Sequence, residues 1–244
     1  MSGADVLRGL HHGPAPLVLP NAWDAASARL VEAAGFPAVA TGSAGVAASL
    51  GYEDNERAPV EEMLTAAGRI CRAVSVPVTV DAEAGYGLPP DELAARLAAA
   101  GAAGCNVEDT DHAAGGLVDA ERQAERLAGL GAGLVVNARV DVFIREWGDP
   151  ADRLAEAVRR GRLYLEAGAE CVYPIWVVDE ETIARLVDQL AAPVNVLYRP
   201  GAPSLRRLAE LGVARISLGP GLHRATETAT RAILERMAAG GDPY

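Results

Sequence analysis

Two carboxylates, Asp81 and Glu83, follow directly on the apolar run Val76–Val80. A five-residue apolar run of this kind is typical of a strand buried in a parallel sheet. Parallel α/β sheets bind their ligands at the carboxyl ends of the strands. The flexible turn Gly85–Gly87 separates both acids from the next helix start, which makes a helix-capping role the weaker alternative. We therefore predict a divalent-metal site at Asp81 and Glu83.

The elements that must position these acids follow one recurring pattern. A segment rich in Ala, Leu and Arg ends in a small residue plus Gly, and an apolar run follows within a few residues. Because glycine suits the left-handed position that ends a helix, each repeat predicts a helix followed by a strand of a parallel sheet. Eight strands are predicted, at Leu17–Leu19, Pro37–Ala40, Val76–Val80, Cys105–Val107, Leu134–Val136, Cys171–Tyr173, Pro193–Leu197 and Ala214–Ser217.

A helical segment with an apolar period near 3.6 residues follows each predicted strand. These segments are Ala25–Ala34, Val60–Val74, Asp91–Ala100, Asp119–Leu130, Asp152–Ala167, Glu180–Leu190, Ser204–Leu211 and Ala225–Ala238. Eight strand–helix units predict an α/β protein of the (β/α)8 TIM-barrel class, with residues 1–244 as a single domain. An open doubly wound sheet is the alternative, but it would usually carry a Gly-rich phosphate turn after the first strand. Asn21–Asp24 is not such a turn.

Acidic residues also follow the fourth predicted strand, at Glu108, Asp109 and Asp111. Carboxylates gathered at one edge of a barrel repel one another unless a cation lies among them. Mg²⁺ suits such a site because it prefers oxygen ligands and often takes only one or two carboxylates directly. Helix capping is an equally open interpretation for Asp109 and Asp111.

Other polar residues at the strand ends suggest how a substrate could be held. The planar guanidinium of Arg139 suits a carboxylate or phosphonate, although an ion pair with Asp141 or with an acid of the fourth strand would also explain it. The turn Thr41–Gly42–Ser43 could present backbone N–H groups to an oxyanion. Asn195 belongs to the seventh predicted strand.

Composition narrows the class of protein. The net charge of −11 argues against nucleic acids and anionic membranes as partners. The three cysteines have no metal-like spacing and suggest reduced, buried thiols. No apolar run reaches the roughly 18–20 residues of a membrane span. We expect a cytoplasmic protein that acts on a small molecule.

Several segments together carry a family resemblance. Asp81–Gly87 resembles the Asp-x-Asp-x-Gly-Tyr-Gly metal motif of the isocitrate lyase/phosphoenolpyruvate mutase superfamily, with Glu83 in place of the second Asp. Further segments are similar to the same superfamily in the same order, and the set covers nearly the whole chain: Thr41–Ser43, Ser49–Asp54, Asn106–Asp109, Asn137–Asp141 and Pro193–Leu197.

The resemblance implies a barrel whose last helix is exchanged between subunits, in a homodimer or homotetramer. It implies Mg²⁺ held by Asp81 directly and by Glu83 and Glu108 directly or through waters. The substrate would be a 2-oxo acid or its enol, with Arg139 on its anionic group, the Thr41–Gly42–Ser43 turn at its carboxylate and Asn195 in the same site. Asp54 matches a site aspartate on the loop after the second strand. The shared chemistry makes or breaks a bond at C3 of a pyruvate unit, through an enolate that Mg²⁺ stabilises.

One segment departs from the superfamily. In the superfamily, the loop after the fourth strand often carries Lys-Arg-Cys-Gly-His, with the cysteine as general acid. The corresponding loop of this chain, Asp109–Leu117, contains no Cys, Lys or Arg. His112 is its one group that titrates near neutrality and is a candidate acid or base, the alternative being an exposed loop histidine. We favour a Mg²⁺-dependent lyase. The alternatives are a phosphonate enzyme acting on a C–P bond and a barrel that binds a ligand without turnover.

Overall fold

Eight parallel strand positions form a ring in the computed structural model, which describes residues 1–244. The strands of the ring are β1 (Leu17–Leu19) with β2 (Asn21–Ala22), β3 (Val39–Thr41), β4 (Val78–Asp81), β5 (Gly104–Glu108), β8 (Val135–Val140), β9 (Cys171–Pro174), β10 (Asn195–Leu197) and β11 (Arg215–Ser217). Pro20 alone separates β1 from β2, and the parallel bridge between Val172 and Val194 joins β9 to β10. These links close the ring, and the predicted (β/α)8 barrel is confirmed.

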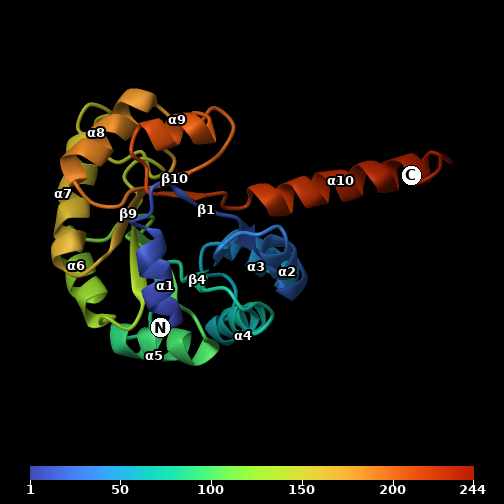
Figure 1. Ribbon diagram of the computed structural model, residues 1–244, viewed down its shortest axis with the longest axis horizontal. Coiled ribbons are helices and arrows are strands. Elements are labelled where there is room, and N and C mark those ends of the chain that lie inside the picture. The colour runs from blue at the N-terminus through green and yellow to red at the C-terminus, as the bar shows by residue number, and fades with distance from the viewer.

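Helices surround the strands (Figure 1). Seven of them occupy predicted positions to within a few residues at either end: α2 (Ala25–Ala33), α4 (Val60–Cys71), α5 (Pro90–Ala100), α6 (Ala120–Gly129), α7 (Arg153–Glu166), α8 (Glu180–Leu190) and α9 (Leu205–Glu210). Aspartates cap three of them, since Asp24 accepts from the N–H of Ser27, Asp119 from the N–H of Arg122 and Asp179 from the N–H of Thr182. The five glycines of the recurring pattern all have positive φ, between 69° and 103°, as a left-handed helix end requires.

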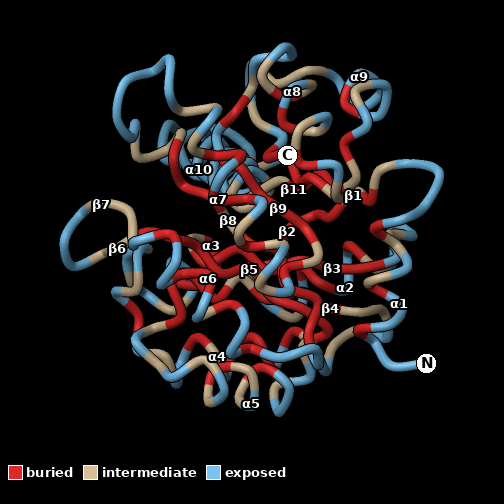
Figure 2. The backbone as a smooth tube through the Cα atoms, turned by 90° about the vertical axis from the view of Figure 1, so that its left-hand side faces the viewer, coloured by how far each residue is buried: buried red, intermediate tan, exposed pale blue.

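Two further helices and a hairpin were not predicted. They are α1 (Gly3–Leu10), α3 (Ser43–Leu50) and the antiparallel pair β6 (Thr110–Asp111) and β7 (Gly116–Leu117). Helix α1 lies over one end of the barrel, where Leu7 is fully buried against Leu17 and Val135. The tube in Figure 2 shows the buried strands at the centre of the molecule, inside the helices. Helix α1 therefore seals the end of the barrel opposite the strand exits.

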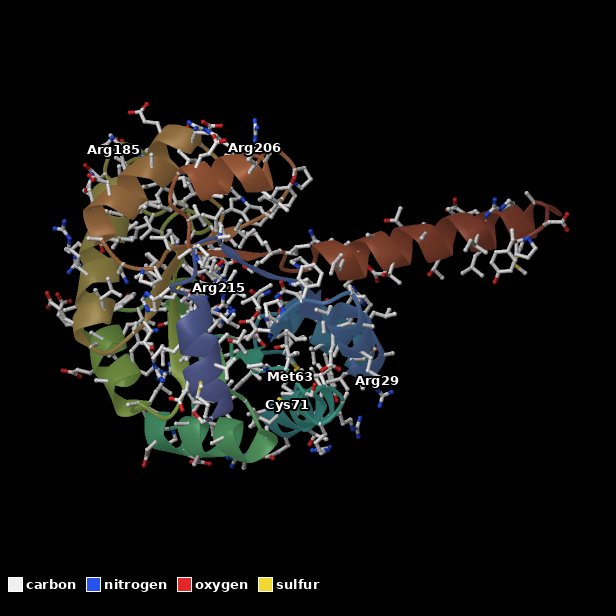
Figure 3. All side chains as sticks on the ribbon, in the orientation of Figure 1. Arg29, Met63, Cys71, Arg185, Arg206 and Arg215 are labelled. Atoms are coloured by element: carbon white, nitrogen blue, oxygen red, sulfur yellow. The ribbon has the colours of Figure 1, made fainter.

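Polar side chains occupy the interior of the barrel between α1 and the strand exits. Arg215, labelled in Figure 3, is fully buried and donates from Nη2 to Oδ1 of Asn106 at 3.0 Å. Asn195 is also fully buried, and its Oδ1 accepts from Oγ of Ser217 at 3.3 Å. In register, Asn195 lies level with Arg215, below the end of its own strand. This layer supports the strand ends from beneath.

The last helix, α10 (Gly221–Ala238), leaves the barrel as an extended arm (Figure 1). None of its residues is buried, although Leu234 and Met237 are apolar and 58% and 49% exposed. No helix combines the length and apolarity that crossing a membrane requires. The arm thus presents apolar side chains that this chain alone does not cover.

Candidate active site

The loop after β4 is held in an unusual backbone conformation. Glu83 and Tyr86 have φ of 47° and 56°, and the glycines between and after them, Gly85 and Gly87, also have positive φ. Left-handed conformations are costly for residues with a side chain and are found most often at functional sites. The N–H of Glu108 donates to the carbonyl of Glu83 at 2.9 Å, which ties this loop to the end of β5.

Asp81 faces the first turn of α3. Its Oδ2 accepts from the N–H of Ser43 at 3.1 Å, and its own N–H donates to Oγ1 of Thr41 at 2.9 Å. The predicted Thr41–Gly42–Ser43 turn is therefore the start of a helix, with Gly42 in the N-cap position. Oδ1 of Asp81 is buried without a hydrogen-bond partner. Burial raises the pKa of Asp81, because the charged form is poorly solvated there.

Glu83 is 3% exposed and lies beside other acids. Burial, reinforced by the charge of Asp81, raises the pKa of Glu83 to about 8, while the donating N–H of Glu56 opposes the shift. That N–H reaches Oε2 of Glu83 at 2.6 Å, and the Glu56 side chain accepts from the N–H of Tyr86 at 2.5 Å. Asp54, on the same loop as Glu56, has a buried Oδ1 with no partner.

Glu108 and Arg139 form the neighbouring part of the site. Nη1 of Arg139 lies 2.5 Å from Oε2 of Glu108, while Nε and Nη2 donate to the two carboxylate oxygens of Asp141 at 2.7 and 2.8 Å. Both ion pairs considered for Arg139 from the sequence are therefore present. Burial raises the pKa of Glu108, and the charge of Arg139 opposes that rise. All three guanidinium nitrogens thus have a carboxylate partner, and one N–H on Nη1 and one on Nη2 remain for an anion.

His112 lies in the turn between β6 and β7, and its side chain is only 14% exposed. Its Nε2 lies 2.8 Å from Oε1 of Glu108, and this neighbour raises the pKa of His112. The alternative of an exposed loop histidine is wrong, because the ring packs against the acidic site. A pocket of about 530 Å³ opens beside it, lined also by Glu56 and Arg126.

Asp109 and Asp111 do not cap helices, which corrects that interpretation. Asp109 is fully buried on the helix side of β5, where its carboxylate accepts from Arg160 at 3.0 Å and from the hydroxyl of Tyr164 at 2.7 Å. Asp111 accepts from the N–H groups of Ala113 and Ala114 and shapes the hairpin turn. Helix α6 is capped instead by Asp119.

The structure brings most of the predicted residues to one end of the barrel. Asp54, Asp81, Glu83 and Glu108 lie close enough that their charges influence one another. Asn195 lies deeper, and Leu197 occupies the end of its strand instead. Glu56 was not predicted, and its only signal in the sequence is its position two residues after Asp54. Asp141 was predicted only as a partner of Arg139, and it binds two of the three guanidinium nitrogens.

A metal fits this donor set in part. No three His, Cys, Asp or Glu side chains are arranged around a common point as metal ligands. However, Asp81 and Asp54 each have a buried carboxylate oxygen without a hydrogen-bond partner, and such an oxygen requires a donor or a cation. Burial is the main cause of the raised pKa values of Asp81 and Glu83, and a nearby cation would stabilise the charged form of both carboxylates. Oxygen-only donors of this kind suit Mg²⁺ with several waters.

Residues 7–238 match the model of the phosphoenolpyruvate phosphomutase family. A protein of Mycobacterium tuberculosis (strain H37Rv) with no assigned function is 37% identical over 86% of this chain and 80% of its own length. A 2-methylisocitrate lyase of Aeropyrum pernix is 30% identical over 78% of this chain and 63% of its own length.

Two crystal structures share the fold over nearly the whole chain. One, from Burkholderia cenocepacia J2315 and provisionally named a phosphonomutase, is 38% identical, with a TM-score of 0.89 over 96% of this chain and 99% of that chain. The other is a 2,3-dimethylmalate lyase of the same superfamily, 26% identical, with a TM-score of 0.87 over 100% of this chain and 88% of that chain. The relatives with assigned activities are enzymes that act on small molecules.

Proposed function

This chain belongs to the phosphoenolpyruvate phosphomutase family, and from that premise we propose that it is a Mg²⁺-dependent lyase. It makes or breaks a C–C bond at C3 of a 2-oxo or 2-hydroxy acid, through the enolate of a pyruvate unit. The observation that carries this proposal is the acidic site at the strand exits, where Asp81, Glu83 and Glu108 lie near one another and Glu108 pairs with Arg139. Such a site suits an anionic intermediate only when a cation offsets the carboxylates.

Each residue has a definite task in this proposal. Asp81 would hold Mg²⁺ directly, and Glu83, Glu108 and Asp54 would hold it directly or through waters. When bound, Mg²⁺ supplies positive charge that stabilises the developing enolate oxygen. The free N–H groups of Arg139 bind the substrate's anionic group, and Asp141 fixes the orientation of the guanidinium. The first turn of α3, from Ser43, offers backbone N–H groups to the substrate carboxylate.

His112 is the proton carrier in this proposal. Its proximity to Glu108 keeps the imidazole charged to a higher pH than usual, so it can donate a proton to C3 of the enolate after cleavage. In the reverse direction the neutral ring accepts that proton. His112 thereby takes the role that the loop cysteine has in the family, since Asp109–Leu117 contains no cysteine.

The direct test of the lyase is release of pyruvate. Purified protein is incubated with Mg²⁺ and a panel of 2-oxo and 2-hydroxy dicarboxylates that includes oxaloacetate, and pyruvate is measured with a coupled reductase. We expect pyruvate from at least one acid, and none when EDTA removes the metal. If no member of the panel yields pyruvate, the lyase proposal fails.

A phosphonate enzyme is the second candidate, because the 38% identical structure carries a phosphonomutase name. Phosphorus NMR of phosphonopyruvate separates the two candidates. Conversion of its phosphonate resonance to that of a phosphate ester or free phosphate would favour the second candidate. An unchanged spectrum together with pyruvate release from a dicarboxylate would favour the first.

We further propose a cytoplasmic homodimer or homotetramer in which α10 packs on a neighbouring subunit. Two observations support it: α10 has no buried residue, and an apolar groove of about 720 Å³ lies beside its base, lined by Leu30, Leu205 and Leu222 among others. All three cysteines are free, as expected for a reducing compartment. Asn195 remains a predicted substrate-binding residue, in an indirect position beneath the site.

A further inference from the structure

A second cavity lies beside the acidic site, on the rim of the barrel. It is the pocket of about 530 Å³ next to His112, and we call it the rim pocket. The loop after β4, the β6–β7 hairpin and the first two turns of α6 form most of its wall. None of the residues proposed to hold the metal or the substrate lines it. His112 alone is shared, and its Nε2 is directed to Glu108.

Two arginines of α6 line the rim pocket without a partner. Arg122 and Arg126 are four residues apart, so they are neighbours on one face of the helix, where like charges repel. Neither guanidinium forms an ion pair or donates a hydrogen bond within the protein. Nε of Arg126 is buried, and a side chain at Gly85 would collide with the same guanidinium. A buried donor in this position indicates an acceptor that the chain itself does not supply.

An unpartnered acceptor lies on the same face of α6. Gln123 is three residues before Arg126, lines the rim pocket and is only 1% exposed. Its Nε2 donates to the carbonyl of Glu108 at 3.0 Å, which fixes the orientation of the amide. Its Oε1 is therefore the free end, and it is buried without a donor. The pocket thus has a donor and an acceptor close together, and neither is satisfied within the chain.

Three carboxylates also line the rim pocket and restrict the kind of ligand that it can hold. Asp111 accepts from two N–H groups of its own turn, and Glu56 accepts from the N–H of Tyr86. Glu125 is exposed on α6. With a neutral His112, the acids of the wall outnumber its arginines by one. A phosphate dianion would be repelled by these acids, whereas a ligand with both a negative and a positive group matches both kinds of side chain.

We propose that the rim pocket binds an α-amino acid with an apolar side chain. The carboxylate of this ligand lies between Arg122 and Arg126, and its ammonium group donates to Oε1 of Gln123. Glu56 supplies a negative charge near the ammonium group. The apolar side chain contacts the apolar residues of the wall, which include Leu88, Pro90 and Val118. The inference does not rest on the lyase function, since the residues that hold the metal and the pyruvate unit take no part in it.

Ordered water is the simpler alternative, because water can satisfy both Nε of Arg126 and Oε1 of Gln123. It does not account for the arrangement of the charges. Three carboxylates line the same pocket as Arg122 and Arg126, yet none of them pairs with either guanidinium. A ligand that lies between the two kinds of charge explains why they are held apart.

The test is calorimetric binding of three matched compounds to the Mg²⁺-containing full-length protein: L-valine, 3-methylbutanoate and isobutylamine. The second lacks the amine of L-valine, and the third lacks its carboxylate. We expect saturable binding of L-valine and at least tenfold weaker binding of the other two, because each loses a charged hydrogen bond. Inorganic phosphate is titrated as well, and we expect it to bind more weakly than L-valine.

Variants place the binding in the rim pocket. Arg122→Gln and Arg126→Gln should each weaken L-valine about tenfold to a hundredfold and leave isobutylamine unchanged. Arg122 is exposed, so its variant is informative even if Arg126→Gln does not fold. Arg185→Gln is the matched control, an exposed arginine of α8 that is labelled in Figure 3. Asp81→Asn should bind L-valine as tightly as the wild-type protein.

The inference is overturned if L-valine does not bind at millimolar concentration, or if 3-methylbutanoate or phosphate binds as tightly as L-valine. It is also overturned if both arginine variants retain wild-type affinity, or if Asp81→Asn loses L-valine, which would assign the binding to the acidic site. Pyruvate release is measured separately. L-valine binding without pyruvate release would retain this inference and reject the lyase, and pyruvate release without L-valine binding would do the reverse.

Discussion

At the scale of single residues, the barrel mouth holds several carboxyl groups that burial makes harder to ionise. Burial raises the pKa of Asp81, Glu83 and Glu108, and Arg139 is the cation that opposes this for Glu108. Burial also raises the pKa of Asp109, to about 6, but Arg160 and Tyr164 donate hydrogen bonds to its carboxylate on the helix side of β5. Glu108 and Asp109 are neighbours in the sequence, yet Glu108 belongs to the acidic site and Asp109 to a buried ion pair with Arg160.

Substitution of Asp81 and of Asp109 should separate these two roles. Asp81→Asn is expected to abolish Mg²⁺ binding in calorimetry and leave the melting temperature of the metal-free protein unchanged or higher, since it removes like-charge repulsion. Asp109→Asn is expected to lower the free energy of unfolding by about 3–5 kcal/mol, because Arg160 loses its buried partner. Equal destabilisation by both variants in urea titrations would argue against a site function for Asp81.

The raised pKa of Glu83 predicts a pH-dependent stability. Its carboxyl group has a pKa of about 8 in the folded chain against an ordinary value of 4.5, so the folded state binds the proton more tightly. The metal-free protein should therefore lose stability as pH rises from about 4.5 to 8, and Asp81 and Glu108 act in the same direction.

Thermal melts at pH 5 and pH 8 with and without Mg²⁺ check this expectation. Mg²⁺ should raise the melting temperature more at pH 8, where its binding need not displace protons. Glu83→Gln should flatten the pH dependence of the metal-free protein. A metal-free protein that is more stable at pH 8 than at pH 5 would contradict the account of Glu83.

At the scale of elements, the loops after the strands distinguish this site more than the strands do. The strands were predictable because apolar runs, helix-ending glycines and short connections recur in order along the chain. Helix α3 was not, because Ser43–Leu50 is small and apolar on every side and lacks a 3.6-residue pattern. Pairs such as Arg160 with Asp109, 51 residues apart, leave no local signal in a single sequence.

The β6–β7 hairpin should be essential for proton transfer. His112→Gln is expected to lower kcat by about 10²–10⁴-fold and to remove the ionisation near neutrality from the pH profile, with little effect on KM. His12→Gln, an exposed histidine at the end of α1, is the control. Unchanged turnover in His112→Gln would show that another group carries the proton.

At the scale of the whole molecule, the barrel and the α10 arm differ in how they are stabilised. The barrel buries most of its apolar core in one cluster of 40 residues, whereas α10 buries none. The apolar pattern of the arm resembles that of the helices that pack on the barrel, so the pattern alone did not predict an arm, and only the family resemblance implied that this helix leaves the barrel. An exposed helix that retains Leu234 and Met237 requires a covering surface, and a second subunit offers one.

A charged residue on the arm should therefore weaken self-association. Leu234→Glu is expected to shift the protein from dimer or tetramer toward monomer in light scattering at micromolar concentration, because burying the carboxylate is unfavourable. Val6→Glu, an exposed apolar residue on α1, should not change the molar mass. A wild-type protein that is monomeric at high concentration would contradict the exchange of α10.

The central claim, formation of a pyruvate enolate at the acidic site, can be tested without knowing the substrate. Proton NMR in D₂O follows the methyl signal of pyruvate in the presence of the protein and Mg²⁺. Enolate formation and return should replace these protons by deuterium, so the signal should fade faster than in buffer. The acceleration should be absent with EDTA, in Asp81→Asn and in His112→Gln. A methyl signal that decays at the buffer rate in the presence of the Mg²⁺-loaded wild-type protein would contradict the account.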